Sequence, residues 1–425
     1  MRSTRRKIYL DYAATTPVDK RVFEAMKPFF SEEFGNSSSA HSFGRGAREA
    51  VEQARQQVAD FFGCDANEII FTSCATESNN LAIKGLILKI LNTLQNKGLK
   101  DVVPHIITSA IEHHCVLDTC QALERDGLAE VTYLPVNSDG VVASESVRKA
   151  IKANTVLVSV MYANNEMGTI QPIKEISHLL AEVNSELSAK SECLSEKIYF
   201  HTDAVQAVNY FDCNVDSLMV DLVSISAHKF YGPKGVGALY IRRGTPIIRI
   251  QDGGEQEYKL RAGTLNTAGI VGLGAAIKLV VEEREVVGER IRRLRDKLIE
   301  GVLKHIPNSK LNGSREQRLP NNANFSFSGA EGEAILLALD LEGIAVSTGS
   351  ACASENLDPS HVLTALNLSP EEAHSSVRFT LGKYTTEEEI DRVLEVLPSI
   401  IERLRKISGS EAGKAKKKLP DDFGC

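Results

Sequence analysis

Short apolar runs alternate with longer segments of helical period over roughly the first 265 residues. Seven runs predict strands, at residues 68–72, 105–109, 131–136, 155–162, 197–202, 222–226 and 237–241. Most are apolar throughout, as expected of strands that are covered on both faces. Several are separated by segments with helical spacing of apolar residues, such as residues 45–62. This alternation predicts an α/β fold with a mostly parallel, seven-stranded sheet.

The pattern changes after residue 266. A long charged helix is expected from about residue 282 to 305, then short strands at residues 323–327, 344–348 and 377–381. Thr386 and Glu389 form a capping-box pair before a last helix. We expect a large domain (20–265), a smaller α+β domain (1–19 and 266–407) and a flexible, lysine-rich tail (408–425). The polar stretch 184–197 is expected to be a surface loop.

Composition excludes several classes of protein. The 425 residues contain 49 Lys and Arg against 56 Asp and Glu, so no basic excess favours a nucleic-acid partner. No apolar run is long enough for a membrane helix, and the N-terminus lacks the apolar core of a secretory signal. The eight cysteines show no metal-ligand spacing. We therefore expect a cytoplasmic protein without a bound metal.

A lysine lies in the turn SAHKFYGPKG (226–235), directly after a predicted strand. Ligands of open α/β sheets bind where the parallel strands end. A buried Lys229 there could form a Schiff base with a carbonyl group, and Ser226 and His228 could bind a phosphate. Taken alone, the turn is explained better as a surface turn with an exposed lysine.

Three other strand ends carry polar residues. Asp203 and Gln206 could serve a pyridine nitrogen and a phenolic oxygen, as in pyridoxal phosphate enzymes. Asp203 would be costly to bury without a cationic partner. Thr76, with backbone amides at a helix start, could hold a phosphate. His113 could stack on a flat cofactor or be a structural histidine.

Two further residues suggest reaction chemistry in the C-terminal part. Cys352 lies among small residues in VSTGSACAS (346–354), where a thiol is either exposed and reactive or a silent surface thiol. Arg378 lies within a short apolar strand. An arginine there usually needs an anion, and a substrate carboxylate would suit it.

Seven motifs occur in order: LDYAATTP (10–17), GNSSSAH (35–41), ATESNN (75–80), ANNEMG (163–168), SAHKFYGPKG (226–235), RAGTL (261–265) and GSAC (349–352). With the Asp203 and Gln206 segment, they resemble the NifS/IscS-like cysteine desulfurases of the class V aminotransferase family over about residues 8–405. The resemblance implies a fold-type I pyridoxal phosphate enzyme that forms a homodimer.

The resemblance also implies a role for each candidate residue. Lys229 would bind the cofactor aldehyde and act as general base, Asp203 would pair with the pyridinium, Gln206 would contact the phenolic oxygen, and His113 would stack on the ring and carry a proton. The phosphate would be bound by Ala75, Thr76, Ser226 and His228, and by Thr264 from the neighbouring subunit. Asn165 would contact cofactor and substrate, with Arg378 on the substrate carboxylate. Cys352 would accept sulfur.

The implied reaction converts L-cysteine to L-alanine and leaves a persulfide on Cys352. The sulfur would pass to an iron–sulfur scaffold or a tRNA-thiolation carrier. Cys74 and Glu255 replace glycines that the family usually has. The 184–197 insertion is similar to selenocysteine lyases and keeps that activity as the alternative. A cofactor-free Cys/His hydrolase is a second alternative. A non-catalytic adaptor is a third, against which Lys229, Asp203 and Cys352 argue.

Overall fold

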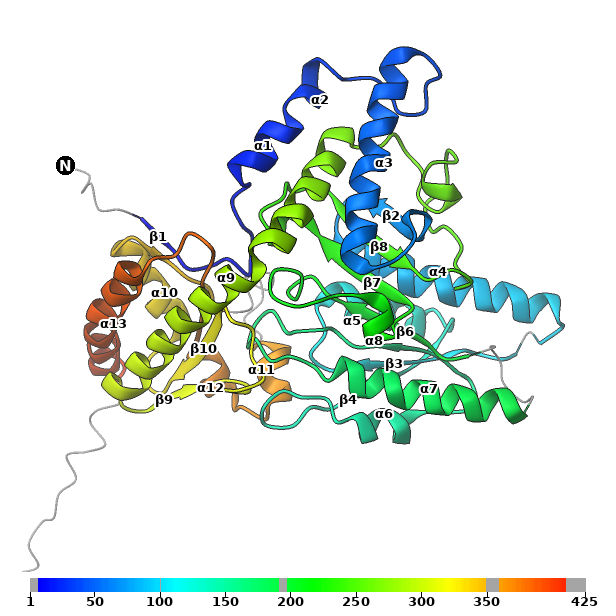
Figure 1. The fold of residues 1–425 in the computed structure, drawn as a ribbon. Helices are drawn as coiled ribbons and strands as arrows, with labels where there is room; N and C mark the ends of the chain where they lie inside the picture. Colours follow the sequence, from blue (N-terminus) through cyan, green and yellow to red (C-terminus); the bar gives the residue numbers. More distant parts are fainter. Residues whose placement is uncertain (1–6, 100, 191–196, 349–358, 410–425) are drawn as a thin grey trace, which may run out of the picture.

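The computed structural model describes residues 7–99, 101–190, 197–348 and 359–409. Two bodies are joined by the long helix α9 (Thr267–His305), which passes from one to the other (Figure 1). Cys352 and residues 410–425 of the expected tail lie outside the described residues.

The larger body is built on a seven-stranded sheet of order β2-β8-β7-β6-β5-β3-β4. Among the described strands of this sheet, only β8 runs antiparallel to its neighbours. The prediction of a mostly parallel, seven-stranded sheet is therefore confirmed. The strands are β2 (Ile69–Thr72), β3 (His105–Ser109), β4 (Glu130–Leu134), β5 (Thr155–Ser159), β6 (Tyr199–Asp203), β7 (Leu222–Ser226) and β8 (Gly237–Ile241).

Helices cover both faces of this sheet because its strands are apolar on both sides. Ile106 packs with α4 (Ala75–Asn96) and α5 (His114–Arg125). The next residue, Ile107, packs in the core on the opposite face. The helices of that second face are α3 (Ser42–Phe62), α6 (Ser144–Ala150), α7 (Ile173–Lys190) and the first half of α9. The short elements around the sheet are α1 (Lys20–Met26), α2 (Pro28–Ser31), η1 (Ala66–Glu68), α8 (Val215–Leu218), η2 (Ala227–Lys229) and η3 (Glu257–Lys259).

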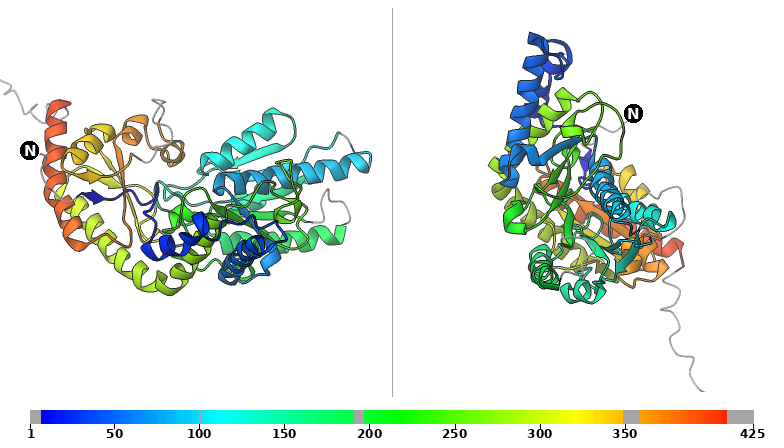
Figure 2. Two further views of the ribbon diagram at one scale, coloured as in Figure 1. Left: turned by 90° about the horizontal axis from the view of Figure 1, so that it is seen from above. Right: turned by 90° about the vertical axis from the view of Figure 1, so that its right-hand side faces the viewer.

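The smaller body has its own apolar core. An antiparallel sheet of order β12-β10-β9 packs against the second half of α9, and α13 lies against the same core. The Thr386–Glu389 capping box is present at the start of α13. The elements are β1 (Ile8–Tyr9), β9 (Ser309–Leu311), β10 (Asn322–Phe327), α10 (Gly332–Leu341), β11 (Ile344–Ala345), β12 (Ser376–Thr380) and α13 (Glu387–Ile407). β1 pairs with β11, so the N-terminal end joins this body (Figure 2).

The domain limits stay a prediction, because three helices link the bodies. Helix α9 contributes Ile277 to the core of the large sheet and Ile291 to the core of the smaller body. Helices α11 (His361–Ala365) and α12 (Pro370–His374) fall within the range 266–407 that the sequence assigns to the smaller domain. Their apolar residues Val362 and Ala373 nevertheless pack in the core of the large sheet.

Two segments differ from the sequence prediction. Helix α9 begins at Thr267, fifteen residues before the expected start near residue 282. Three glycines obscure the helical pattern there, and a Cβ at Gly274 would lie 2.9 Å from the Cα of Ala54 in α3. Glycine thus allows α3 and α9 to approach closely. The expected surface loop at 184–197 is wrong for residues 184–190, which complete α7.

Within the described ranges, no helix is both long enough and apolar enough to cross a bilayer. In the same part of the chain, no group of three or more His, Cys, Asp or Glu side chains is arranged to hold a metal ion. The five cysteines described are free thiols, and Cys115, Cys120 and Cys213 are buried.

Candidate active site

A cavity of about 290 Å³ lies where the parallel strands of the large sheet end. Strands β2, β3, β5, β6 and β7 run in one direction, so the residues that follow them meet at one edge. The cavity is lined by Ala13, Ala14, Cys74, Ala75, Thr76, His113, Cys115, Met161, Ala163, Asn165, Asp203, Val205, Gln206, Ser226, His228, Lys229 and Arg378. Among the candidate residues that the structure describes, only Thr264 is outside this lining.

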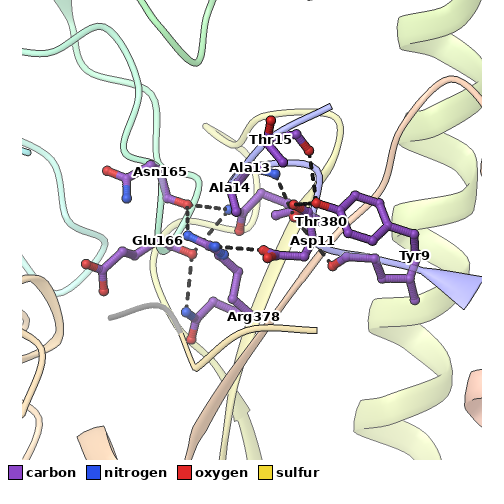
Figure 3. Close-up of polar contacts among 12 residues, drawn as sticks. Tyr9, Asp11, Ala13, Ala14, Thr15, Asn165, Glu166, Arg378 and Thr380 are labelled. Atoms are coloured by element: carbon purple, nitrogen blue, oxygen red, sulfur yellow. Dashed lines mark hydrogen bonds and ion pairs between the residues drawn. The ribbon is translucent and has the colours of Figure 1, made fainter. Parts of the chain in front are cut away.

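The Lys229 amine is held inside the cavity by the N-terminal segment. The turn η2 directly follows β7 and carries Lys229 at its end. Its Nζ donates to the carbonyl oxygens of Ala13 at 2.6 Å and Ala14 at 2.9 Å (Figure 3 shows both alanines). Asn209 Nδ2 donates to the Lys229 carbonyl oxygen at 2.7 Å. The lysine is therefore fixed at its backbone and at its amine, unlike an exposed surface lysine.

Asp203 ends β6 as a buried carboxylate with two neutral hydrogen-bond donors. Its Oδ2 accepts from Asn79 Nδ2 at 2.7 Å, and its Oδ1 accepts from the Val205 amide at 3.0 Å. A buried carboxylate is stabilised most by a cation, which these two donors do not supply. The site therefore suits a cationic ligand group beside Asp203.

His113 caps the N-terminus of α5 with a neutral ring. Its Nδ1 accepts from the Cys115 amide at 3.1 Å and lies 3.0 Å from the Cys115 thiol. Burial lowers the pKa of His113. Because Nδ1 accepts a hydrogen bond, the proton of the neutral ring lies on Nε2. Burial also raises the pKa of the Cys115 thiol well above its usual range, so this thiol is a weak nucleophile.

Helix α4 begins at Ala75, which lines the cavity. The free backbone amides of a helix N-terminus favour negative charge. The Ser226 hydroxyl is buried and has no hydrogen-bond partner among the described residues, although it lines the same cavity. His228 Nδ1 lies 3.1 Å from Thr15 Oγ1, and burial lowers the pKa of His228 to about 4.

The two substitutions of family glycines fit the backbone without strain. Cys74 precedes α4 with φ −176°, an extended conformation open to any residue. Glu255 is exposed and forms an ion pair with Lys259 at 3.1 Å. Neither side chain occupies a position that requires glycine.

Arg378 links three parts of the chain. Its Nη1 donates to the Asn165 carbonyl oxygen at 3.0 Å, and its Nη2 donates to Asp11 Oδ1 at 2.9 Å (Figure 3). Its Nε is buried without a partner in the described structure. The expected anion beside Arg378 is thus supplied in part by Asp11. A second anion would satisfy the remaining donors of the guanidinium.

Two further candidates, Gln206 and Thr264, lie on either side of the cavity boundary. Gln206 lines the cavity and donates to the Ala13 carbonyl oxygen at 3.2 Å. Thr264 is exposed, and its neighbour Arg261 forms an ion pair with Glu77 in the first turn of α4 at 2.9 Å. The Arg261–Glu77 pair therefore joins the Thr264 segment to the first turn of α4.

The structure adds residues that the sequence did not single out. Asp11, Ala13 and Ala14 lie in the first motif, and Asn79 lies in ATESNN, so their motifs were visible but their contacts were not. Nothing in the sequence pointed to Cys115 as a site residue except its position directly after His113 and His114.

The residues present fit pyridoxal phosphate. An amine, a carboxylate that lacks a charged donor, a buried hydroxyl without a partner and a helix N-terminus all face one cavity. The amine matches an aldehyde, and the carboxylate matches a protonated ring nitrogen. The hydroxyl and the helix N-terminus match a phosphate.

Comparisons with known proteins agree with this geometry. The family profile of aminotransferase class-V matches residues 8–393. The chain is 55% identical to the cysteine desulfurase IscS of Dictyoglomus turgidum, covering 95% of this chain and 97% of the relative. It is 51% identical to the IscS of Clostridium botulinum, with 95% and 96% covered.

Two solved structures are similar over most of the chain. A NifS-like protein has a TM-score of 0.83 and 38% identity, covering 94% of this chain and all of its own. SspA in complex with cysteine has a TM-score of 0.75 and 39% identity, covering 90% of this chain and all of its own. The chain therefore belongs to the aminotransferase class-V family and, within it, to the cysteine desulfurases of the IscS kind.

Proposed function

We propose that this cavity binds pyridoxal phosphate through Lys229 and removes sulfur from L-cysteine. When bound, the cofactor supplies an aldehyde for the lysine and a ring that accepts electrons from the substrate. The observation that carries the proposal is the meeting of Lys229, Asp203 and the α4 N-terminus in one cavity. Asp203 holds the ring nitrogen protonated, and Ala75, Thr76, Ser226 and His228 bind the phosphate. Gln206 contacts the phenolic oxygen.

The substrate carboxylate binds at Arg378. The unpartnered Nε of Arg378 provides a buried donor, and Asn165 lies beside it with its carbonyl oxygen on Nη1. A fork of parallel N–H donors fits a carboxylate. The solved relative SspA is a complex with cysteine, which supports L-cysteine as the substrate.

Two side chains move protons. Lys229 takes the proton from the substrate Cα as general base, since its amine is placed inside the cavity. His113 stacks on the ring and carries a proton for the substrate sulfur. Its Nε2 bears the proton in the neutral form, and burial keeps the ring neutral by lowering its pKa.

Cys352 accepts the sulfur. The C–S bond of cysteine breaks and an S–S bond forms, giving L-alanine and a persulfide; carbon gains the two electrons that sulfur loses, and the thiol proton ends on the products. Cys352 lies outside the described residues. Ser347, which precedes it, exchanges two backbone hydrogen bonds with Arg378, of 3.2 and 2.6 Å. Ser347, five residues before Cys352 in the sequence, therefore lies beside the proposed carboxylate site.

The proposed assembly is a homodimer that passes sulfur to an acceptor protein. Thr264 would reach the partner's phosphate site, and its exposed position outside the cavity of its own chain is compatible with this role. The acceptor class is an iron–sulfur scaffold or a tRNA-thiolation carrier, as the IscS resemblance implies.

The test compares Cys352→Ser with two control variants, Cys74→Ser and Cys115→Ser. Cys74 and Cys115 both line the cavity. Anaerobic assays measure alanine and label persulfides after L-cysteine is added. Cys352→Ser should keep cofactor absorbance but lose alanine formation and persulfide, while Cys115→Ser and Cys74→Ser keep all three. Persulfide on Cys74 or Cys115, with wild-type turnover in Cys352→Ser, would contradict the sulfur route. Much faster turnover of L-selenocysteine than of L-cysteine would favour the lyase alternative.

A further inference from the structure

One threonine hydroxyl bridges the residues on either side of Lys229. Thr16 Oγ1 donates to the His228 carbonyl oxygen at 2.9 Å and accepts from the Tyr231 amide at 2.8 Å. The Thr16 amide donates to the same His228 oxygen at 2.9 Å. Thr16 is only 3% exposed, so no water competes freely for these groups. The turn that carries Lys229 is therefore tied to the N-terminal segment at both of its ends.

The turn held in this way is conformationally strained. Tyr231 has φ 65°, a left-handed conformation that bulky residues rarely adopt. Such a conformation persists only when the surrounding contacts fix it. The Tyr231 amide donates to Thr16 Oγ1 at 2.8 Å, and the Tyr231 hydroxyl oxygen accepts from the Lys383 amide at 2.6 Å. Its carbonyl oxygen accepts from the Asp19 amide at 2.9 Å.

The same N-terminal segment also holds the other end of the lysine. Ala13 and Ala14, just before Thr16, accept the two hydrogen bonds of Lys229 Nζ. Residues 13–16 thus fix the backbone on both sides of Lys229 and the amine itself. Loss of the Thr16 hydroxyl would leave the His228 oxygen with one partner fewer and the buried Tyr231 amide with none from this residue.

We propose that Thr16 is a positioning residue for Lys229, which sets the turn so that the amine meets the cofactor aldehyde. The inference rests on the proposed function, because it assigns Thr16 a role only if Lys229 binds pyridoxal phosphate. It does not require Thr16 to touch the cofactor or the substrate.

The test compares Thr16→Val, which removes the hydroxyl, with Thr16→Ser, which keeps it. The affinity for pyridoxal phosphate is measured by titrating the full chain and following the visible absorbance of the lysine-bound cofactor. Thr16→Val should raise the Kd about ten-fold, since one or two buried hydrogen bonds are lost. Thr16→Ser should stay within about two-fold of wild type.

Thr155→Val is the matched control for a lost buried hydroxyl. Thr155 is buried at the opposite end of β5, where its Oγ1 accepts from the Lys152 amide at 2.7 Å and lies 2.8 Å from His105 Nδ1. This variant should lower the thermal unfolding temperature without changing the Kd. An equal rise of Kd in Thr155→Val would show a general effect of stability and overturn the inference.

The outcomes separate the two claims. If wild type never gains the absorbance, the proposed function fails and the inference with it. If wild type gains it and Thr16→Val binds the cofactor equally well, or Thr16→Ser is as weak as Thr16→Val, the inference alone fails. If Thr16→Val does not fold, Thr16→Ala removes the hydroxyl with a smaller side chain and is judged by the same criteria.

Discussion

The two sides of the cavity are built in different ways. On the sheet side, Asp203, Ser226 and Ala75 lie at or just after the ends of parallel strands, within a few residues of each strand. On the other side, Arg378 of β12 meets Asp11 near the N-terminus, 367 residues away in sequence (Figure 3). The sheet side follows from local chain geometry, and the other side depends on the whole fold.

This difference separates the two proposed tasks of the site. The sheet side offers a carboxylate, a helix N-terminus and Lys229, all of which suit the cofactor. The other side offers the guanidinium of Arg378, which suits the substrate. Changes on the sheet side should therefore affect cofactor binding and chemistry, whereas changes around Arg378 should affect KM for cysteine.

The largest effect is expected for Lys229→Ala. Without the amine, the cofactor loses its covalent link and the substrate loses its general base, so alanine formation should fall by about 10⁴-fold or more. Lys234→Ala, an exposed lysine in the same turn, is the control and should remain active. Retained colour and turnover in Lys229→Ala would remove the lysine from the mechanism.

The second largest loss of activity is expected for Asp203→Asn. The amide keeps the shape but cannot hold the ring nitrogen protonated, so kcat should fall on the order of 10²–10³-fold, the scale of one lost electrostatic contact. Asp221→Asn is the matched control, since Asp221 pairs with Lys197 at 2.6 Å away from the cavity. Cofactor spectra and kcat are measured for both; similar kcat values would refute the special role of Asp203.

Arg378→Lys tests the opposite side of the cavity. Lysine cannot form the planar fork on a carboxylate, so KM for cysteine should rise about 10- to 100-fold while the cofactor spectrum is unchanged. Asp11→Asn should lower KM a few-fold, because it removes the anion that shares Arg378 with the substrate. Changes of the same sign in both variants would mean that Asp11 chiefly orients Arg378.

The smallest effect is expected on stability, from the buried carboxyl group of Glu112, which directly precedes His113. Burial raises the pKa of Glu112 from 4.5 to about 8. The folded protein thus keeps a proton that the unfolded chain releases near pH 4.5, so the free energy of unfolding decreases between pH 4.5 and about 8. Glu112→Gln should lack this contribution. Denaturant titrations from pH 5 to 8 should show wild type losing stability relative to the variant.

The exposed Glu124→Gln serves as control for that comparison and should follow the wild-type pH profile. If the free energies of unfolding of wild type and Glu112→Gln differed by the same amount at every pH from 5 to 8, Glu112 would be ionised in both the folded and the unfolded state.

The sheet, its strand ends and the lysine turn could be predicted from the sequence because they depend on local pattern. The bounds of β3, β7 and β8 match the apolar runs. The start of α9 could not be predicted, because Gly269, Gly272 and Gly274 lower the helix propensity of this segment. Only contacts in the folded protein, such as that of Gly274 with α3, explain these glycines.

The fine structure of the site was less predictable for a similar reason. Asn79 and Asp203 lie 124 residues apart, and no local pattern shows that their side chains meet. Thr16 was visible within its motif, but its bridge across Lys229 depends on how the N-terminal segment crosses the turn. Contacts between distant segments are fixed by tertiary packing alone.

The most direct test of the central claim is to locate the bound cofactor chemically. The purified protein is incubated with pyridoxal phosphate, reduced with borohydride and digested, and the peptides are analysed by mass spectrometry. We predict one major pyridoxyl adduct, on Lys229. A major adduct on Lys234 or another lysine, or no adduct at all, would contradict the assignment of this cavity as the active site.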